Sequence, residues 1–193
     1  NTEQNMRKTS QELLPLTVSN INSDVYNIYP SFPSGEKVFK GFSTLAEEIG
    51  NEKVIIIDGF GGTMWNTFRE KLHTELNLKN KTIFWYSVDT CLKPAKEIQD
   101  MIPGSLNGED PVFGKKYTGN LIDFFDEKKL KLITPDPDVD ICIIYGTGAA
   151  LTGITGKLLY ADVPKNELQY RMRAGAVTNL GTDEIFENSQ AYK

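Results

Sequence analysis

Residues 53–58 (KVIIID) constrain the fold of this chain more than any other stretch. They form a nearly continuous β-branched run, which is typical of a strand covered on both faces, as in a parallel sheet. A glycine-rich turn follows at residues 59–63, and residues 64–78 then place apolar side chains four positions apart, as an amphipathic helix does. A strand, a glycine turn and a helix in direct succession predict an α/β protein.

The alternation of strand and helix continues along the chain. Further strands are predicted at residues 82–88, 140–145 and 157–163. Helices are predicted at residues 117–130 and, with Pro164 at the first helical position, over the residues that follow it. This order predicts a three-layer, mostly parallel, doubly wound α/β sheet.

The first 50 residues form a separate part in this prediction. Residues 1–22 are polar with weak periodicity, which is typical of an arm. Residues 25–42 alternate apolar with polar side chains around prolines and a glycine, so we expect two short strands around a turn. A capping-box pattern at residues 44–47 opens a short helix that a glycine ends. We therefore divide the chain into an amino-terminal arm (residues 1–50) and one compact α/β domain (residues 51–193).

The side-chain composition excludes several classes of protein. A single histidine, His73, and two cysteines, Cys91 and Cys142, cannot assemble a zinc site of the His/Cys kind, so we expect no metal site. The net charge of −5 gives no basic field for nucleic acid, and no apolar run approaches the roughly 20 residues that span a bilayer. Because two distant cysteines do not suggest a disulfide framework, we expect a cytoplasmic protein that binds neither nucleic acid nor membrane.

Ligands of an open parallel sheet bind at the carboxyl ends of its strands, where loops and helix N-termini converge. Three of these ends carry aspartates, namely Asp58, Asp89 and Asp162. The glycine turn follows the first, and its candidate phosphate-binding residues are Gly59, Gly61, Gly62 and Thr63, because backbone N–H groups at a helix N-terminus favour an anion. In the competing interpretation the glycines only permit a tight turn, and each aspartate only caps the helix after its strand.

The glycine turn lacks the side chains of known phosphate loops. The P-loop pattern G-x-x-x-x-G-K-[ST] needs a lysine for the β- and γ-phosphates and a hydroxyl for Mg²⁺. In either register those positions hold Met64, Trp65 or Asn66. The dinucleotide-binding pattern G-x-G-x-x-G is matched only at Gly59 and Gly61, with Met64 in place of the third glycine. Any anion would therefore be bound by the backbone of the turn.

Over residues 53–175 the chain resembles P-loop kinases of the uridine-kinase and phosphoribulokinase type. Residues 140–146 (DICIIYG) look like that family's D-x-x-I-x-E-G segment, and residues 110–114 (DPVFG) are similar to its D-x-P-x-x-F segment. Residues 159–164 (LYADVP) and the two arginines after them are similar to its last strand and arginine-bearing lid helix. The resemblance therefore implies a kinase-like fold.

The same resemblance assigns roles to single residues. It places Asp89 at the catalytic base position and makes Arg171 and Arg173 phosphate-binding residues. The two arginines are two positions apart and point to different sides of a helix, so we expect at most one to reach a ligand; a salt bridge with Glu167 is the alternative. The family's acidic residue after the third strand is Tyr145 here. Without that residue and the missing lysine and hydroxyl, phosphoryl transfer is poorly supported.

A second resemblance rests on longer stretches of sequence. Residues 25–49, 54–62 (VIIIDGFGG), 145–151 (YGTGAAL) and 160–181 look like the amino-terminal region of bacterial proteins labelled class I mannose-6-phosphate isomerases. In that group this region precedes a cupin β-barrel, so the resemblance implies a carboxy-terminal cupin domain as a partner in a longer parent chain. The isomerase zinc site lies in the barrel and would not be in these residues.

The sequence therefore predicts a degenerate nucleoside-kinase-like domain that binds a nucleotide or sugar phosphate, or only packs on a cupin domain. We expect no resident cofactor. One alternative is an active nucleoside or sugar kinase with an Mg-nucleotide as ligand, in which Lys93 or Lys115 supplies the missing lysine. The other is a purely structural module. His73 is interpreted as a surface or interface residue and Cys142 as core. Cys91 precedes a helix predicted to start at Pro94.

Overall fold

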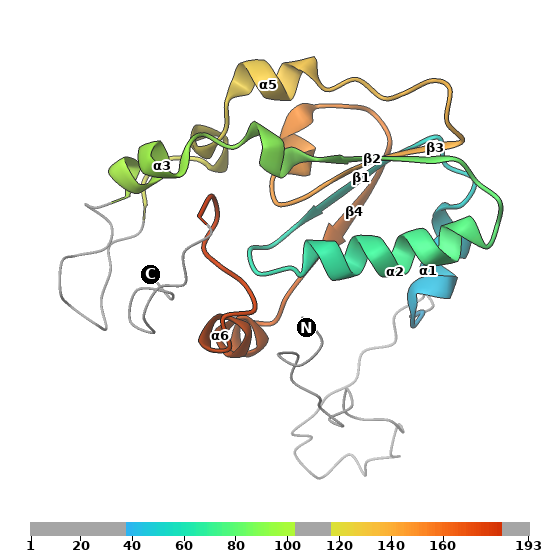
Figure 1. The fold of residues 1–193 in the computed structure, drawn as a ribbon, viewed down its shortest axis with the longest axis horizontal. Coiled ribbons are helices and arrows are strands. Elements are labelled where there is room, and N and C mark those ends of the chain that lie inside the picture. Colours follow the sequence, from blue (N-terminus) through green and yellow to red (C-terminus); the bar gives the residue numbers. More distant parts are fainter. Residues whose placement is uncertain (1–37, 103–116, 183–193) are drawn as a thin grey trace, which may run out of the picture.

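The computed structural model describes residues 38–102 and 117–182, and Figure 1 shows how their elements are arranged. The strands are β1 (Val54–Gly59), β2 (Ile83–Ser87), β3 (Ile141–Tyr145) and β4 (Lys157–Ala161). All neighbouring pairs are parallel, in the order β2-β3-β1-β4. The predicted α/β class with a parallel sheet is confirmed.

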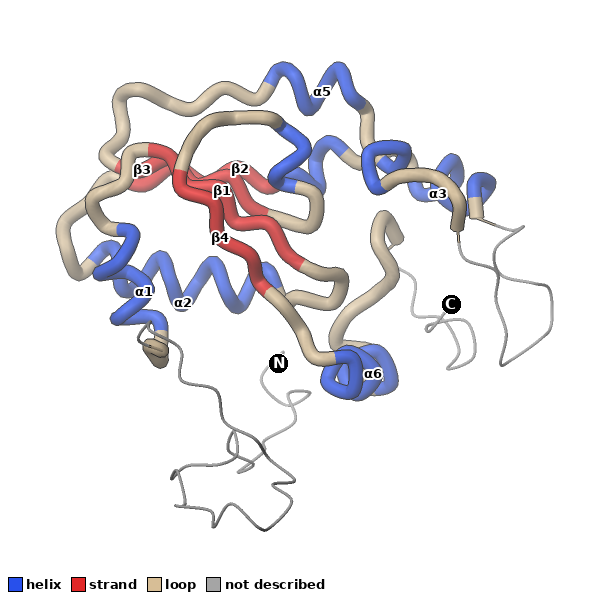
Figure 2. The backbone as a smooth tube through the Cα atoms, turned by 180° about the vertical axis from the view of Figure 1, so that it is seen from behind, coloured by secondary structure: helices blue, strands red, loops and turns tan. Residues whose placement is uncertain are grey.

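Helices cover both faces of the sheet, as Figures 1 and 2 show from opposite sides. The α-helices are α1 (Phe42–Ile49), α2 (Trp65–Asn77), α3 (Ala95–Met101), α5 (Glu127–Leu132) and α6 (Lys165–Arg173). The described residues also form three short 3₁₀ helices, η2 (Val88–Cys91), η3 (Leu121–Phe124) and η4 (Ala149–Thr152). Among the described helices, none is both long and apolar enough to cross a membrane.

Two hydrophobic clusters hold the layers together. On one face, α1 and α2 pack against β1 and β3 through fully buried side chains such as Ile49, Leu72 and Leu76. On the other face, η2, α5 and η4 pack through Val88 and Leu130 among others. Each buried leucine or isoleucine contributes about 1.5–3 kcal/mol relative to an exposed one. The two clusters therefore make one three-layer body, with the sheet in the middle.

The central strands account for the uninterrupted apolar runs in the sequence. All five residues of β3 are buried, and so are Ile55, Ile56 and Ile57 of β1, because helices lie on both sides of them. Among the described strands, the outer ones β2 and β4 have one neighbour each, and they leave side chains such as Leu158 exposed. Burial on both faces is what a continuous β-branched strand requires.

Helix α1 belongs to the core of the body. Its Ala46 and Ile49 are fully buried, and the ring of Phe42 packs edge-on against Phe68 of α2 at 5.4 Å. The predicted start at a Thr44 capping box is wrong: the helix begins at Phe42, and the Thr44 hydroxyl donates to the Lys40 carbonyl within its first turn. The predicted end at a glycine is confirmed. The two strands expected in residues 25–42 lie almost entirely outside the described residues.

The single helix predicted over residues 117–130 is wrong. Asn120 and Asp123 form a capping box around η3, and the Asp126 carboxylate caps α5 by accepting from the Lys128 and Lys129 amides. Between them Phe125 is extended, buried and paired with Leu92. Side chains of this kind compete with the helical backbone for its N–H groups, so two short helices form instead of one.

The strand order locates the ligand crevice. Strand β3 separates β1 from β2, whereas the dinucleotide-binding order places the first two strands side by side, so the sheet is not of that type. The chain leaves β1 towards α2 on one face and leaves β3 towards η4 on the other. Adjacent strands with connections on opposite faces form a crevice at their carboxyl ends. The ends of β1 and β3 are therefore where a ligand is expected.

Candidate functional site

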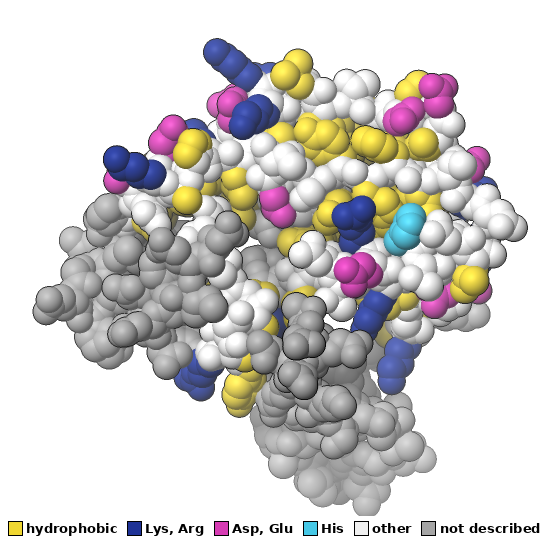
Figure 3. Space-filling model, in the orientation of Figure 1, with side chains coloured by type: hydrophobic (Ala, Val, Ile, Leu, Met, Phe, Trp, Pro, Cys, Tyr) yellow, Lys and Arg dark blue, Asp and Glu magenta, His cyan; other side chains and the backbone are white. Residues whose placement is uncertain are grey.

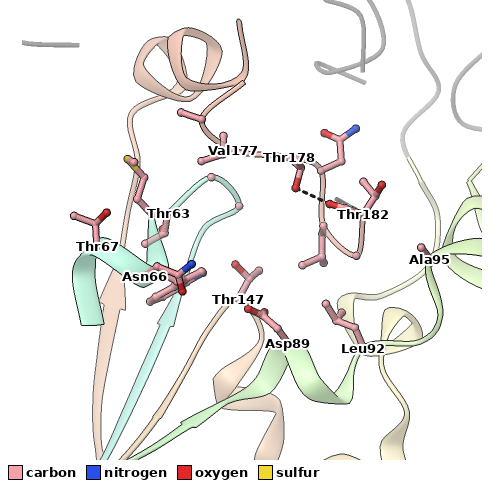
Figure 4. A pocket seen from close by; sticks show the side chains of 18 of the residues that line it. Thr63, Asn66, Thr67, Asp89, Leu92, Ala95, Thr147, Val177, Thr178 and Thr182 are labelled. Carbon is pink, nitrogen blue, oxygen red and sulfur yellow. Dashed lines mark hydrogen bonds between the residues drawn. The ribbon is translucent and has the colours of Figure 1, made fainter. Parts of the chain in front are cut away.

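A pocket of about 570 Å³ lies at this end of the sheet. Four segments line it: the glycine turn with the first turn of α2, the η2–α3 connection, Thr147 after β3, and residues 176–182. Figure 4 shows Asn66, Asp89 and Thr147 on one side and Thr178 and Thr182 across from them. Its volume is within the range of small-molecule sites.

The glycine turn is closed by Thr63. Its backbone N–H and its hydroxyl both donate to the Phe60 carbonyl, at 3.4 and 2.9 Å. Gly61, Gly62 and Thr63, three of the residues expected to bind phosphate, line the pocket. Gly59 does not: a Cβ there would lie 2.7 Å from the Ala161 carbonyl and 2.9 Å from the Trp65 ring. Gly59 therefore serves close packing between β1 and β4.

The first turn of α2 leaves backbone donors without acceptors. The helix has no side-chain cap, and no described residue accepts from the amides of Asn66 and Thr67, which line the pocket. Unpaired N–H groups and the positive end of a 13-residue helix favour a bound anion. The pocket thus has donors for an anionic group without a P-loop lysine.

Asp89 is the carboxylate of the pocket. It sits on η2, directly after β2, where Ser87 caps the 3₁₀ helix and also donates to Asp89 Oδ2 at 3.2 Å. The carboxylate is open to the pocket but crowded by protein atoms, and this burial raises its pKa, while the Ser87 hydrogen bond lowers it. Gly146, with φ 124°, has no Cβ, and so Val88 and Asp89 can approach the end of β3.

The other two strand-end aspartates bind the backbone. Asp58 Oδ1 accepts from the Gly59 and Gly148 amides at 2.6 and 2.8 Å, and its Oδ2 accepts from the Ala150 amide at 3.0 Å. Asp162 accepts from the amide of the next residue at 2.9 Å. Neither lines the pocket. The capping interpretation is wrong for both, because neither α2 nor α6 has a side-chain cap. Asp58 instead ties the end of β1 to the turn after β3.

The two arginines of α6 are placed differently from the expectation. Arg171 donates from Nη1 to the Gly62 carbonyl at 2.9 Å and from Nε to Glu167 at 3.0 Å. Arg173 is exposed at the end of the helix, and neither arginine is among the pocket-lining residues. The alternative, a salt bridge with Glu167, is found for Arg171, which also contacts the carbonyl of the glycine turn.

The sequence did not reveal the wall formed by residues 176–182. This stretch follows α6 and contributes hydroxyl and amide groups of Thr178, Asn179 and Thr182 to the pocket. Lys93, one of the two lysines considered, also lines the pocket, with its Nζ donating to the Asp123 carbonyl at 2.7 Å. Lys115, the other, lies outside the described residues, as does the segment at 110–114. The sequence feature that could have indicated this wall is the grouping of Thr178, Asn179 and Thr182 around Gly181.

The remaining candidates have structural roles. His73 Nδ1 accepts from Trp85 Nε1 at 3.1 Å, so the histidine is part of an interface between α2 and β2. Cys142 is buried in β3 as predicted, and Cys91 is also buried. In the described part of the chain, no three His, Cys, Asp or Glu residues are grouped as metal ligands would be. Figure 3 shows acidic and basic side chains scattered among each other over the face in view.

Within the described ranges, the chain is an α/β protein with a four-stranded parallel sheet and a polar pocket at the carboxyl ends of its strands. Residues 41–193 match the model of a family described as a domain of unknown function, DUF8485, and the chain belongs to that family. No curated protein and no solved structure matches the chain. The resemblances to P-loop kinases and to isomerase-linked domains stay predictions.

Proposed function

We propose that this domain binds a small phosphorylated molecule, a nucleotide or a sugar phosphate, in the pocket at the ends of β1 and β3, and does not transfer its phosphoryl group. The observation that carries the proposal is the meeting of the glycine turn, the uncapped start of α2 and the Asp89 carboxylate in one pocket. The phosphate would occupy the anion-favouring end. Asp89 and the threonine hydroxyls would accept and donate hydrogen bonds with sugar hydroxyls at the other.

The charge of the pocket favours one phosphate over three. Among the residues that the structure describes, its titratable lining consists of Asp89 and Lys93, and the Lys93 ammonium already donates to a carbonyl. A nucleoside triphosphate needs a lysine or arginine and a divalent cation to neutralise its oxygens. A helix N-terminus is equivalent to roughly half an elementary charge, which suits a single phosphate group. We therefore favour a sugar phosphate or nucleoside monophosphate.

Gly61 offers a sharp test of anion binding. Nothing lies within 4 Å of a Cβ at this position, and its backbone is not in the left-handed region, so a side chain is tolerated there. Gly61→Asp would place a carboxylate at the turn, and Gly61→Asn is its neutral control of the same shape. In calorimetric titrations of the full chain with mannose 6-phosphate, AMP and Mg-ATP, the aspartate variant should bind at least about tenfold more weakly than the asparagine variant. Equal affinities would refute phosphate binding at the turn.

Active phosphoryl transfer is the second candidate, because Lys93 and Asp89 line the same pocket. In that case Asp89 would accept the proton of the attacking hydroxyl, and Lys93 would leave its carbonyl partner for a phosphate. Transfer from ATP to a nucleoside or sugar that is lost in both Asp89→Asn and Lys93→Gln would establish it. ATP turnover at the level of a buffer blank would leave the binding role as the better account.

The wider setting of the domain is also a proposal. The resemblance to isomerase-linked sequences favours a parent chain in which a cupin barrel follows this domain, and a purely structural role would then be packing on that barrel. Co-expression of the domain with such a barrel, followed by size-exclusion chromatography, would detect the packing. Elution as two separate species would count against it.

A further inference from the structure

The single histidine of the chain lies where α2 packs on β2. The ring of His73 is edge-on to that of Trp85 on β2, with the ring centroids 6.2 Å apart. Its Nδ1 accepts from Trp85 Nε1 at 3.1 Å, and its Nε2 lies 2.9 Å from the side-chain amide of Asn77, one turn further along α2. Both ring nitrogens therefore have a partner, and the partner of Nδ1 comes from a different element.

The partner of Nδ1 decides in which protonation state this arrangement exists. An indole nitrogen can only donate a hydrogen bond, so Nδ1 of His73 presents a lone pair to Trp85. The neutral ring then carries its proton on Nε2, which donates to the amide oxygen of Asn77 once that amide is flipped. A second proton can bind only at Nδ1, where it would bring two N–H groups face to face. The bond from Trp85 consequently exists only while His73 is neutral.

The charged residues around His73 do not replace this bond in deciding its state. On α2, Arg69 and Glu70 lie four and three positions earlier, the spacing at which helical side chains are neighbours, and their charges are opposite. None of the residues of β2 is charged. Helix α1 lies towards β4, the far edge of the described sheet, where its Glu48 pairs with Lys157 at 3.6 Å. Among the described residues, the groups that face His73 thus contribute opposite charges that offset each other.

Trp85 begins a row of aromatic rings that ends at the pocket. It packs edge-on against Tyr145 at the end of β3, at a centroid distance of 5.5 Å, and Tyr145 packs against Trp65 at 6.0 Å. Trp65 is the first residue of α2 and lines the pocket. Because closely packed rings leave little free space between them, a movement of the first ring displaces the next. The row therefore connects His73, in the middle of α2, with the wall of the pocket.

We propose that His73 is a pH-sensitive switch that holds this aromatic row when it is neutral and releases it when it is protonated. Protonation at Nδ1 removes the acceptor of the partly buried Trp85 N–H, and an indole that loses its acceptor turns towards another one. Tyr145 and Trp65 then repack, and the wall of the pocket changes shape. This inference goes beyond the proposed function and needs no ligand. The change falls between about pH 5 and pH 8, the range in which imidazoles titrate.

The two indole N–H signals in heteronuclear NMR spectra of the full chain test the switch. Because the chain has two tryptophans, Trp65→Phe and Trp85→Phe assign these signals. As the pH falls from about 8 to about 5, the Trp85 signal should shift along the same titration curve as the ring protons of His73, because its N–H loses its acceptor. The Trp65 signal should shift with the same midpoint.

His73→Asn is the matched control, because Asn Oδ1 lies close to the place of Nδ1 and can accept from Trp85 but does not titrate. In this variant the Trp85 signal should stay constant over the same pH range. Asp89 lines the same pocket and is present in both proteins, so any shift of the Trp65 signal that Asp89 causes also appears in the control.

Three results would overturn the proposal. The first is a Trp85 signal that stays constant while the ring of His73 titrates, and the second is a ring that stays neutral down to about pH 5. The third is a Trp65 signal that shifts equally in the wild type and in His73→Asn, which would refute the connection to the pocket. If His73→Asn does not fold, agreement or disagreement between the Trp85 and His73 titration curves of the wild type decides the outcome.

Discussion

Removal of the Asp58 carboxylate should reveal how much the site depends on a backbone clamp. The carboxylate accepts from three amides, at 2.6 Å from Gly59, 2.8 Å from Gly148 and 3.0 Å from Ala150. It therefore joins the end of β1 to the turn after β3, which are the two strand ends that form the crevice. Asp58→Asn and Asp58→Ala both keep the strand but weaken this link.

The burial of each amide sets the magnitude. Gly148 is buried, so its N–H would be left without a partner in Asp58→Ala, at a cost of about 1–3 kcal/mol. Ala150 is exposed and water can replace the carboxylate there. With the bond at buried Gly59 included, we expect Asp58→Ala to lower the free energy of unfolding by about 2–4 kcal/mol. Asp58→Asn keeps one acceptor oxygen and should lose about 1–2 kcal/mol.

Urea denaturation followed by circular dichroism measures these free energies. Asp162→Asn is the matched control, since Asp162 also ends a strand but accepts only from the amide of the next residue, and it should lie within about 0.5 kcal/mol of the wild type. The thermal midpoint of Asp58→Ala should fall by about 5–15 °C for a domain of this size. If Asp58→Ala were as stable as Asp162→Asn, the clamp would not hold the crevice together and the reasoning would be refuted.

Three further predictions follow from single contacts. Gly62→Ala should destabilise the chain by about 1–3 kcal/mol, because of its φ of 85° and an overlap with a leucine of α6, whereas Gly61→Ala should be neutral in the same urea assay. Burial raises the pKa of Asp89, so its stability contribution is present at acid pH and is lost as the pH rises through the folded-state pKa. Asp89→Asn should therefore be more stable than the wild type at pH 7 and equal to it near pH 3, and a less stable variant at pH 7 would contradict this. Hydrogen bonds from the N–H and hydroxyl of Thr82 lower the pKa of Asp140. The stability that Asp140 contributes is therefore present at neutral pH and is lost on acidification. The loss of unfolding free energy caused by Thr82→Val should accordingly shrink towards about pH 2.

The parts of the fold that the sequence predicted are those in which local pattern and burial agree. Residues 53–58 and 140–145 are apolar throughout because helices cover both faces of β1 and β3. Residues 117–130 show where pattern alone fails. Their apolar spacing suits a helix, but Asn120 and Asp126 bind backbone amides and Phe125 is drawn into the second cluster in an extended conformation. The capping side chains therefore determine the structure of this segment, although its apolar spacing suits a single helix.

The site shows a similar division. The glycine turn and Asp89 were predictable, because the end of a strand in a parallel sheet fixes their place. The roles of Asp58 and Arg171 were not, because each depends on a partner 90 or more positions away: Gly148 for the aspartate and Gly62 for the arginine. Nothing in the local sequence distinguishes a strand-end aspartate that binds amides from one that faces a pocket.

The fluorescence of Trp65 tests the central proposal, binding of a phosphorylated molecule in this pocket, most directly. The chain has two tryptophans, of which Trp65 lines the pocket and Trp85 does not, so Trp85→Phe leaves one reporter at the site. Titration of this variant with AMP or mannose 6-phosphate should give a saturable change in Trp65 emission. The change should be reduced at least about tenfold in apparent affinity by Gly61→Asp and kept by Gly61→Asn. An emission that stays constant with both probes, in a variant shown to be folded, would contradict the proposal.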